Sequence, residues 1–170
     1  MIRLTTLCYL EKEGHYLMLH RVSKKEDVNA GKWIGIGGKF EPGEAPEDCM
    51  RRETLEETGF RLESCRFRGI ITFIYDHKDP EYIFTYTSDH FTMDHTDGPS
   101  PLPVPVCDEG IFRWVPKAEV LDLELWEGDR YLLQYLLEDR TEPFSLKLCY
   151  DAKDNLTEAW ELSEGYRRLK

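Results

Sequence analysis

The chain has 170 residues, of which 33 are acidic and 22 basic, and its formal charge is −11. This excess of negative charge repels the phosphates of DNA and RNA, so we expect no nucleic-acid polymer as a partner. A hydrophobic content of 41% excludes a disordered chain, and no apolar run approaches the roughly 18 residues that a membrane-spanning helix requires. Length and composition therefore predict a single globular domain over residues 1–170 with no membrane partner. They leave the oligomeric state open.

The five cysteines are scattered along the chain, and no two of them form a C-x-x-C pair. This pattern argues against a disulfide framework and a zinc ribbon, and it is typical of a reducing compartment. The apolar segment at the N-terminus reaches Glu11 too early for a signal peptide. We therefore expect the protein in the cytoplasm.

Two short β-prone runs open the chain. Thr5–Leu10 and Tyr16–His20 are separated by Glu-Lys-Glu-Gly, which predicts a hairpin. Gly31–Lys39 is too rich in glycine for an ordinary strand interior. Pro46–Thr58 begins with a proline and is followed by a glycine, so we expect one helix over these residues.

The second half of the chain alternates strands with one more helix. Strands are predicted at Cys65–Ile74, Tyr82–Phe91 and Ile111–Val115, and a loop with four prolines at Asp97–Gly110. Trp126–Glu138 carries leucines at helical spacing and predicts a helix that packs on a sheet. Phe144–Tyr150 and Leu156–Leu162 predict a C-terminal hairpin over about residues 144–162. Together these elements indicate an α+β fold in which helices cover a mixed sheet.

Three glutamates lie close together on the first predicted helix. Glu53, Glu56 and Glu57 fall within an arc of about 100° when each residue turns the helix by about 100°. Like charges at i, i+3 and i+4 repel by about 0.2–0.5 kcal/mol per pair. Cys49 shares this arc, whereas a purely solvated acidic face lies opposite the apolar residues. From the helix alone, a solvated face and a cation site both remain open.

The residues upstream favour the cation site. Gly37 and Gly38 have no Cβ, so their backbone can approach a ligand closely. Glu44 stands just before the helix, where a carboxylate can accept bonds from unpaired amides, and Arg52 can hold Glu56 one turn further on. Several carboxylates together with a carbonyl oxygen are the hard ligands that Mg²⁺ or Mn²⁺ prefers.

Residues 38–60 resemble the Nudix box, G-x5-E-x7-R-E-U-x-E-E-x-G-U, where U is a bulky aliphatic residue. The seven fixed positions are occupied by Gly38, Glu44, Arg52, Glu53, Glu56, Glu57 and Gly59. Thr54 and Phe60 depart mildly from the pattern at the two U positions. The resemblance implies a Nudix fold, an α/β/α sandwich with a mixed sheet between helices. It also implies hydrolysis of a nucleoside diphosphate linked to another group, with a divalent ion and a water nucleophile.

The resemblance assigns roles to the box residues by position. Glu56 and Glu57 are the main metal ligands, and Glu53 and the Gly38 carbonyl assist them. Arg52 belongs to the same catalytic set. Phosphoryl chemistry needs neutralised charge and a water in line with the leaving group, and metal ions provide both.

Shorter patches resemble the MutT-type purine nucleoside triphosphatases. They are Gly31–Lys39, an acidic loop before Trp114, Trp126–Asp129 and the closing hairpin, so the similarity spans roughly residues 4–162. This subgroup includes the enzymes that clear oxidised purines such as 8-oxo-dGTP from the nucleotide pool, which protects DNA from mutation. It implies a Mg²⁺-dependent (or Mn²⁺-dependent) reaction that yields a nucleoside monophosphate and pyrophosphate.

The subgroup resemblance also points to residues outside the box. Glu109 resembles a loop carboxylate that binds metal or deprotonates water, although an ordinary acidic loop residue is the alternative. Arg21, Lys24 and Lys39 are candidates for the triphosphate, with surface solvation as the alternative for each. Solvation is the favoured alternative for Lys24.

The base-binding candidates are Trp126, which could stack on a purine, and Asp129, which could bond its Watson–Crick edge. A plain core tryptophan is the alternative for Trp126. Ile34 stands where the oxidised-purine enzymes carry an amide, and Gly128 where they carry a second aspartate. A pocket that lacks a hydrogen-bonding partner loses discrimination between close analogues, so the preferred base stays open.

Other functions compete with this prediction. The substrate could be a dinucleoside polyphosphate, for which Tyr75 is a candidate contact, or ADP-ribose or an RNA 5′ end. A non-catalytic nucleotide sensor is a further alternative, although such domains usually lose a box carboxylate. His77, His90 and His95 each follow an aspartate, but their spacing is not that of a zinc site.

Overall fold

The structure is a computed structural model that describes residues 2–22, 27–93 and 104–170. Its elements in chain order are β1 (Arg3–Lys12), β2 (His15–His20), β3 (Trp33–Ile34), α1 (Pro46–Thr58), β4 (Phe60–Leu62), β5 (Arg66–Tyr75), β6 (Glu81–Ser88), β7 (Phe91–Met93), β8 (Val106–Cys107), β9 (Gly110–Pro116), the 3₁₀ helix η1 (Lys117–Asp122), α2 (Glu127–Leu137), β10 (Phe144–Tyr150), β11 (Leu156–Glu161) and β12 (Arg167–Arg168). In the described ranges, no helix is long and apolar enough to cross a bilayer.

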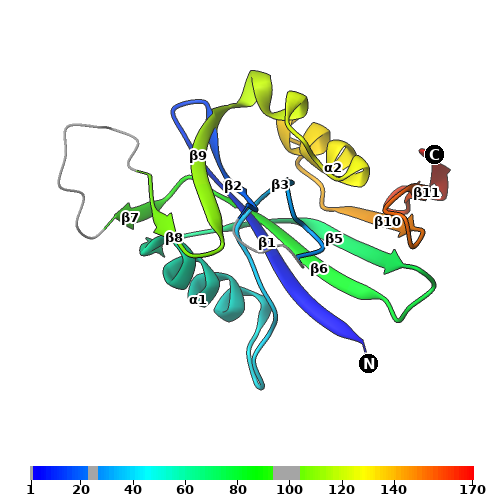
Figure 1. Ribbon diagram of the computed structural model, residues 1–170, viewed down its shortest axis with the longest axis horizontal. Helices are drawn as coiled ribbons and strands as arrows, with labels where there is room; N and C mark the ends of the chain where they lie inside the picture. Colours follow the sequence, from blue (N-terminus) through cyan, green and yellow to red (C-terminus); the bar gives the residue numbers. More distant parts are fainter. Residues whose placement is uncertain (1, 23–26, 94–103) are drawn as a thin grey trace.

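A ten-stranded mixed sheet forms the centre of the described part of the chain. Its order is β12-β11-β10-β5-β6-β1-β2-β9-β8, with β3 paired to β2. The pairs β1–β6 and β5–β10 are parallel, and β1–β2, β5–β6 and β10–β11 are antiparallel. Figure 1 shows the sheet between α1 and α2. The predicted α+β class, a mixed sheet flanked by helices, is confirmed.

Each helix covers its own hydrophobic cluster. Under α2, the buried residues Leu132, Leu133 and Leu136 pack with β10 and β11. Under α1, Met50 packs with apolar side chains from β1 and β2. The leucines predicted to pack α2 on a sheet therefore do so.

The predicted hairpins and helix are confirmed. β1 and β2 pair antiparallel through a turn in which Glu13 and Gly14 have φ of 48° and 75°. α1 occupies the expected residues 46–58, with its proline in the first turn. Gly59 ends it in the left-handed region at φ 73°, and its N–H donates to the Leu55 carbonyl at 2.8 Å. β10 and β11 form the C-terminal hairpin.

The glycine-rich segment after β3 runs antiparallel to β1 at close range, with bridges from Cys8 to Ile36 and from Thr5 to Lys39. Cys8 and Ile36 exchange two backbone bonds of 2.6 and 2.9 Å. A Cβ on Gly37 would lie 1.9 Å from the Thr6 carbonyl oxygen, and one on Gly35 2.7 Å from that of Cys8. These glycines are required because two backbones touch there, and the segment leads directly into the loop before α1.

Two predicted segments, one strand and one loop, are interrupted in the structure. The strand expected at Tyr82–Phe91 breaks after Ser88, and its last residue, Phe91, begins β7, which pairs with β4 instead. The Ser88 hydroxyl donates to the carbonyls of Ser64 and His90 at this break, which turns the chain out of the sheet. The loop expected over Asp97–Gly110 is described from residue 104 onward, and it contains β8 paired to β9.

Candidate active site

One cleft of about 490 Å³ lies between α1 and the turn that joins β8 to β9. Its lining residues are Glu53, Glu56, Glu57, Val106, Cys107, Asp108 and Glu109. The sequence prediction grouped Glu109 with the box glutamates although about fifty residues separate them, and the fold brings them to the same cleft. Among the residues that the structure describes, the lining therefore holds four glutamates and an aspartate and contains no lysine or arginine.

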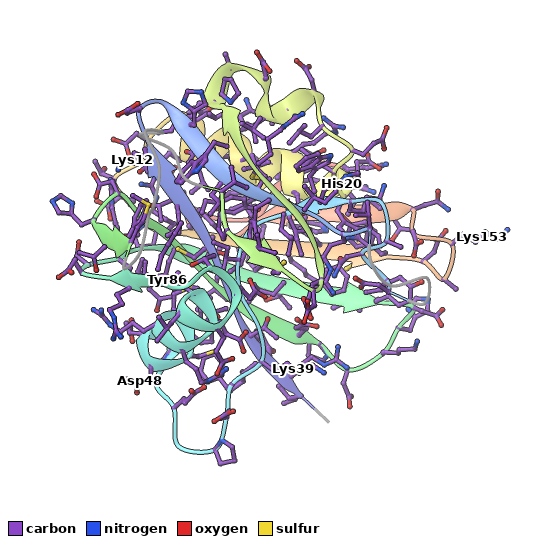
Figure 2. The ribbon with its side chains drawn as sticks, turned by 60° about the vertical axis from the view of Figure 1, so that its left-hand side comes forward. Lys12, His20, Lys39, Asp48, Tyr86 and Lys153 are labelled. Atoms are coloured by element: carbon purple, nitrogen blue, oxygen red, sulfur yellow. The ribbon has the colours of Figure 1, made fainter. Side chains whose placement is uncertain are left out.

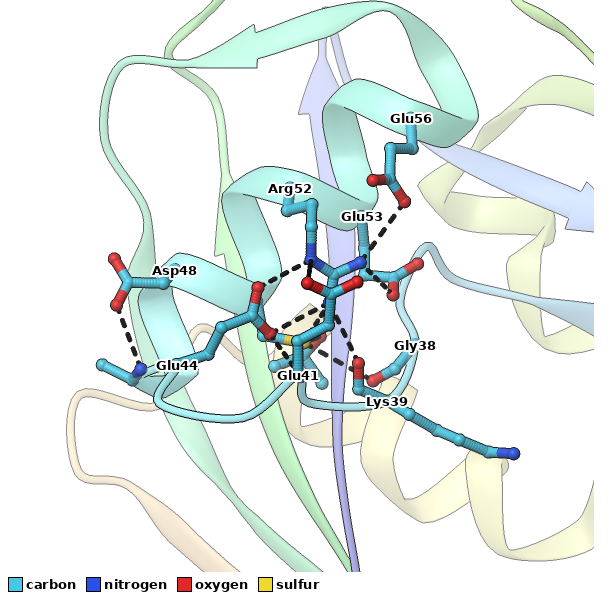
Figure 3. Close-up of polar contacts among 11 residues, drawn as sticks. Gly38, Lys39, Glu41, Glu44, Asp48, Arg52, Glu53 and Glu56 are labelled. Atoms are coloured by element: carbon cyan, nitrogen blue, oxygen red, sulfur yellow. Dashed lines mark hydrogen bonds and ion pairs between the residues drawn. The ribbon is translucent and has the colours of Figure 1, made fainter.

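Arg52 organises the carboxylates on one side of this cleft. Its guanidinium donates to both Glu44 oxygens at 2.6 and 3.0 Å, to Glu53 at 2.7 Å and to Glu56 at 3.3 Å. It also donates to the Lys39 carbonyl at 3.0 Å. Figure 3 shows Arg52 in the middle of these partners. The paired guanidinium bonds lower the pKa of Glu44 to about 2.

The Glu44 carboxylate accepts hydrogen bonds from Arg52 and not from the amides of α1. Apart from the two bonds from Arg52, it accepts a bond from the Glu41 amide at 2.8 Å, outside α1. The amide of Ala45 at the start of α1 donates instead to Asp48 at 3.0 Å. The expectation that Glu44 pairs with helix amides is therefore wrong, because its carboxylate is taken up by a guanidinium one to two turns away.

Gly38 makes room for Glu53. A Cβ on Gly38 would lie 2.3 Å from the Glu53 carboxylate carbon. The Gly38 carbonyl accepts a bond from the Thr6 amide at 2.9 Å and a weak one from Cys49 Sγ at 3.7 Å. Gly37 and Gly38, the two glycines expected to admit a ligand, thus admit the protein's own atoms, β1 at Gly37 and Glu53 at Gly38.

Glu57 is the most perturbed carboxylate of the cleft. Its Oε2 is buried and has no hydrogen-bond partner. Burial raises the pKa of Glu57 to about 8, and the negative charges of Glu109 and Glu53 add to the shift. A buried carboxylate oxygen without a partner is costly, so this position is satisfied only when a proton or a cation is present.

In this structure most glutamates of the cleft pair with Arg52 or Arg21 and do not gather around one point. Across the described ranges, no three His, Cys, Asp or Glu side chains converge closely enough to enclose a metal ion. Arg52 draws Glu53 and Glu56 to itself, and Arg21 binds Glu109. The expected convergence on one point is therefore not seen. The unpartnered oxygen of Glu57 and the all-oxygen donor set still fit a hard divalent cation.

The three cations predicted for a triphosphate have different surroundings. The Arg21 side chain is 12% exposed, and its guanidinium is bonded to Asp27 at 2.6 Å and to Glu109. Lys39 is exposed, and its side chain extends away from the carboxylates in Figure 3. In Figure 2, Lys39 lies on the side of the sheet that carries Asp48 of α1, far from Lys153. Lys24 lies outside the described residues.

The base-binding candidates lie outside the cleft lining, near the start of α2. Trp126 is 8% exposed and belongs to the core, where its ring meets Tyr150 edge-on at 5.1 Å. The Lys32 amine lies 5.8 Å from the Trp126 ring centre. Burial raises the pKa of Asp129 to about 7, although the positive charge of Lys32 opposes this shift. Ile34 is partly buried at the end of β3.

Tyr150 explains the glycine at position 128. A Cβ on Gly128 would lie 2.6 Å from the Tyr150 hydroxyl and 2.6 Å from Leu148 Cδ1. The Gly128 amide donates to that hydroxyl at 2.7 Å. The sequence reasoning noticed a missing aspartate at this position but could not see that a tyrosine from β10 fills the space.

The sequence reasoning also missed Asn29 and Asp27. Trp126 Nε1 donates to Asn29 Oδ1 at 2.8 Å, and Asp27 binds Arg21. The available signal was the run Asp27-Val-Asn-Ala-Gly31, whose residue types favour a tight turn. The sequence did not point to three further residues of the cleft lining because they lie in the proline-rich segment, which was predicted only as a loop. These residues are Val106, Cys107 and Asp108.

Comparisons with known proteins agree with this arrangement. The family profile described as NUDIX domain matches residues 1–136. The uncharacterized Nudix hydrolase YvcI of Bacillus subtilis is 28% identical over 137 residues, which are 78% of each chain. The oxidized purine nucleoside triphosphate hydrolase of Mus musculus is 31% identical over 118 residues, which are 69% of this chain and 70% of the relative.

Solved structures share the fold. A MutT protein from Bacillus halodurans superposes with a TM-score of 0.78 at 23% identity, over 94% of this chain and 97% of that one. A MutT protein from Methanosarcina mazei Go1 gives 0.66 at 22% identity, over 83% and 96%. Since the profile spans both walls of the cleft, from the box helix to the β8–β9 turn, the chain belongs to the Nudix hydrolase family.

Proposed function

We propose that this Nudix hydrolase is a Mg²⁺-dependent pyrophosphohydrolase of purine nucleoside triphosphates, with 8-oxo-dGTP as the favoured substrate and a nucleoside monophosphate and pyrophosphate as products. The observation that carries the proposal is the buried, unpartnered oxygen of Glu57 in a cleft with three further glutamates. Such a cleft repels a triphosphate unless cations neutralise it, and its oxygen donors suit Mg²⁺ or Mn²⁺. The name of the mouse relative supports the choice of substrate.

The residues of the cleft divide the work. Glu56 and Glu57 would hold the metal, with Glu53 and the Gly38 carbonyl as further donors. When bound, a divalent ion supplies charge neutralisation at the phosphates and lowers the pKa of water. Glu109 accepts the proton of the attacking water, and Arg52 keeps Glu44, Glu53 and Glu56 oriented. Pre-positioned groups of this kind lower the barrier because they need no reorganisation during the reaction.

Substrate binding falls to residues around the cleft. Lys39 is exposed on the loop before α1 and can reach phosphate oxygens, and Lys24 keeps the same assignment. Trp126 and Asp129 would contact the base. With a pKa of about 7, the Asp129 carboxyl is both donor and acceptor near neutral pH, so it can pair with more than one purine edge.

The substrate is tested by kcat/KM with Mg²⁺ on dGTP, 8-oxo-dGTP, diadenosine tetraphosphate, ADP-ribose and a triphosphorylated RNA oligonucleotide. We expect 8-oxo-dGTP to rank among the best of these substrates. A clear preference for ADP-ribose, the dinucleotide or the RNA end would refute the proposed substrate and leave the family assignment intact. Binding of nucleotides without turnover of any of them would identify a sensor.

A further inference from the structure

Four hydrogen bonds in series join the start of α2 to the acidic cleft. Trp126 Nε1 donates to Asn29 Oδ1 at 2.8 Å, and the backbone N–H of Asn29 donates to Asp27 Oδ1 at 3.0 Å. Arg21 Nε donates to Asp27 Oδ2 at 2.6 Å, and Arg21 Nη1 donates to Glu109 Oε2. The base-binding candidate Trp126 and the catalytic candidate Glu109 are therefore connected through three residues. These are Asn29, Asp27 and Arg21.

The turn in the middle of this series, residues 27–32, is stabilised by backbone hydrogen bonds within it and to Arg21. Inside it, the amides of Ala30 and Lys32 donate to the carbonyls of Asp27 and Asn29, both at 2.9 Å. The Gly31 amide donates to the Arg21 carbonyl at 2.7 Å, and the Arg21 amide donates to the Lys32 carbonyl at 3.0 Å. Arg21 is thus bonded to the turn through both its backbone and its side chain.

The Arg21–Asp27 bond is shielded from solvent. The two side chains are 12% and 10% exposed, whereas that of Glu109 is 35% exposed. A charge-assisted bond between two largely buried groups is stronger than one in water. The bond from Arg21 to Glu109 therefore connects the more exposed Glu109 carboxylate to the shielded Arg21–Asp27 pair.

We propose that Arg21 is a positioning residue which holds Glu109 at the edge of the cleft, and that the turn at residues 27–32, anchored by Asn29 to Trp126, holds Arg21 in place. The proposal rests on the proposed function in so far as Glu109 is catalytic. It gives Arg21 a different task from the triphosphate contact expected from the sequence, since its guanidinium is already engaged with two carboxylates.

Two consequences separate this role from a merely structural one. Arg21 is a cation that shares Glu109 with any metal in the cleft, so removing its charge should tighten metal binding while slowing turnover. Asn29 is uncharged and is separated from Glu109 by Asp27 and Arg21, so its loss should slow turnover and leave metal affinity unchanged.

The bridge itself is tested without metal or substrate, by the indole N–H resonances of the four tryptophans in ¹H–¹⁵N spectra. The Trp126→Phe spectrum assigns the resonance. We expect Arg21→Gln to displace the Trp126 resonance by more than a line width, and Asn29→Ala should displace it because it removes the acceptor of the indole N–H. The matched control Arg66→Gln removes an exposed arginine that binds Asp139, and it should leave the resonance in place. An unmoved Trp126 resonance in Arg21→Gln would overturn the bridge.

The positioning role is tested by Mn²⁺ affinity, from electron paramagnetic resonance of free Mn²⁺, together with kcat. Arg21→Gln should bind Mn²⁺ about 3- to 10-fold more tightly and turn over about 10-fold more slowly. Asn29→Ala should lower kcat about 3- to 10-fold with Mn²⁺ affinity within about 2-fold. Weaker Mn²⁺ binding in Arg21→Gln would contradict the proposal. If that variant does not fold, Arg21→Lys keeps the charge but loses the two-pronged contact, and it should slow turnover at unchanged Mn²⁺ affinity.

The double variant Arg21→Gln/Asn29→Ala closes the test. If both residues act through one bridge, the double variant is no slower than Arg21→Gln alone, whereas independent effects multiply and would refute the bridge. A wild-type protein that neither binds Mn²⁺ nor hydrolyses any nucleotide would refute the proposed function instead, and the indole spectra would still decide the bridge.

Discussion

Two glutamates that each bury a carboxylate oxygen, Glu57 in the cleft and Glu161 at the end of β11, show that the same side chain can have different roles. Glu161 is 3% exposed, and one of its oxygens accepts bonds from the Ser163 amide at 3.2 Å and from the Ser163 hydroxyl. Its other oxygen lies 3.6 Å from Arg140 Nη1 and has no hydrogen bond. Burial by itself raises the pKa of Glu161, but the bonds from Ser163 and Tyr135 outweigh it and the net pKa is lowered.

Glu57 has the opposite balance. Its pKa is raised to about 8 by burial and by the charges of Glu109 and Glu53, and the opposing effects of Arg21 and the Gly37 amide are smaller. The protein supplies one Glu161 oxygen with hydrogen bonds from Ser163 and places Arg140 beside the other, whereas it surrounds Glu57 with like charge. A buried carboxylate that receives hydrogen bonds and a cation from the protein has a structural role. A buried carboxylate without such partners is suited to bind a cation from solution.

The largest expected effect is on catalytic activity, and it distinguishes Glu57 from Glu161. Glu57→Gln should lower kcat by about 10²–10³-fold or more, because the cleft loses a charged oxygen donor. Glu161→Gln, an equally conservative change, should stay within about 3-fold of wild type. Pyrophosphate release on the preferred nucleotide measures both. Near-full activity of Glu57→Gln would remove Glu57 from the proposed metal site.

The next effect is the response of stability to metal. Mg²⁺ at about 100 times its dissociation constant should stabilise the wild type by about 2.7 kcal/mol. For a chain of this length that raises Tm by roughly 5–10 °C. Glu161→Gln should show the same increase in scanning calorimetry, and Glu57→Gln little of it. An equal rise in Glu57→Gln would mean that the ion binds elsewhere.

Without metal, the two variants should change stability in opposite directions. The folded protein raises the pKa of Glu57 from 4.5 to about 8, so this carboxyl costs stability as pH rises through that interval. Glu57→Gln should therefore gain about 1–3 kcal/mol at pH 8 and little at pH 4.5. Glu161→Gln should lose about 1–3 kcal/mol at pH 8, because Arg140 and Ser163 lose a charged partner. Urea unfolding in EDTA measures both, and a loss of stability in Glu57→Gln at pH 8 would reverse the comparison.

The smallest effect sets the scale for an ordinary surface pair. Lys170 Nζ lies 2.6 Å from Glu127 Oε1, and both side chains are more than 40% exposed. Lys170→Gln should change the free energy of unfolding by less than about 0.5 kcal/mol in the same urea experiment. A change as large as that of Glu161→Gln would show that burial does not distinguish these pairs.

Much of the site was predictable because it is local. The helix Pro46–Thr58 follows from a proline at its start and a glycine at its end, and the helical turn then places Glu53, Glu56 and Glu57 on one face. The strand break at Ser88 was missed although Ser88 and Asp89 are residue types that favour turns, and the pairing of β7 with β4 was not visible in the sequence. The partner of Glu44 was also missed, because several donors lay within its reach.

By itself the sequence determined the hairpins, the box helix and the acidic arc, because backbone geometry sets the spacing of neighbouring side chains. Tertiary structure alone decided which charges are neutralised. Arg21 meets Glu109 across 88 positions of sequence, Tyr150 fills the space beside Gly128, and Glu57 keeps an oxygen without a partner. Those outcomes depend on which strands lie side by side in the sheet, and no local pattern of residues encodes that proximity.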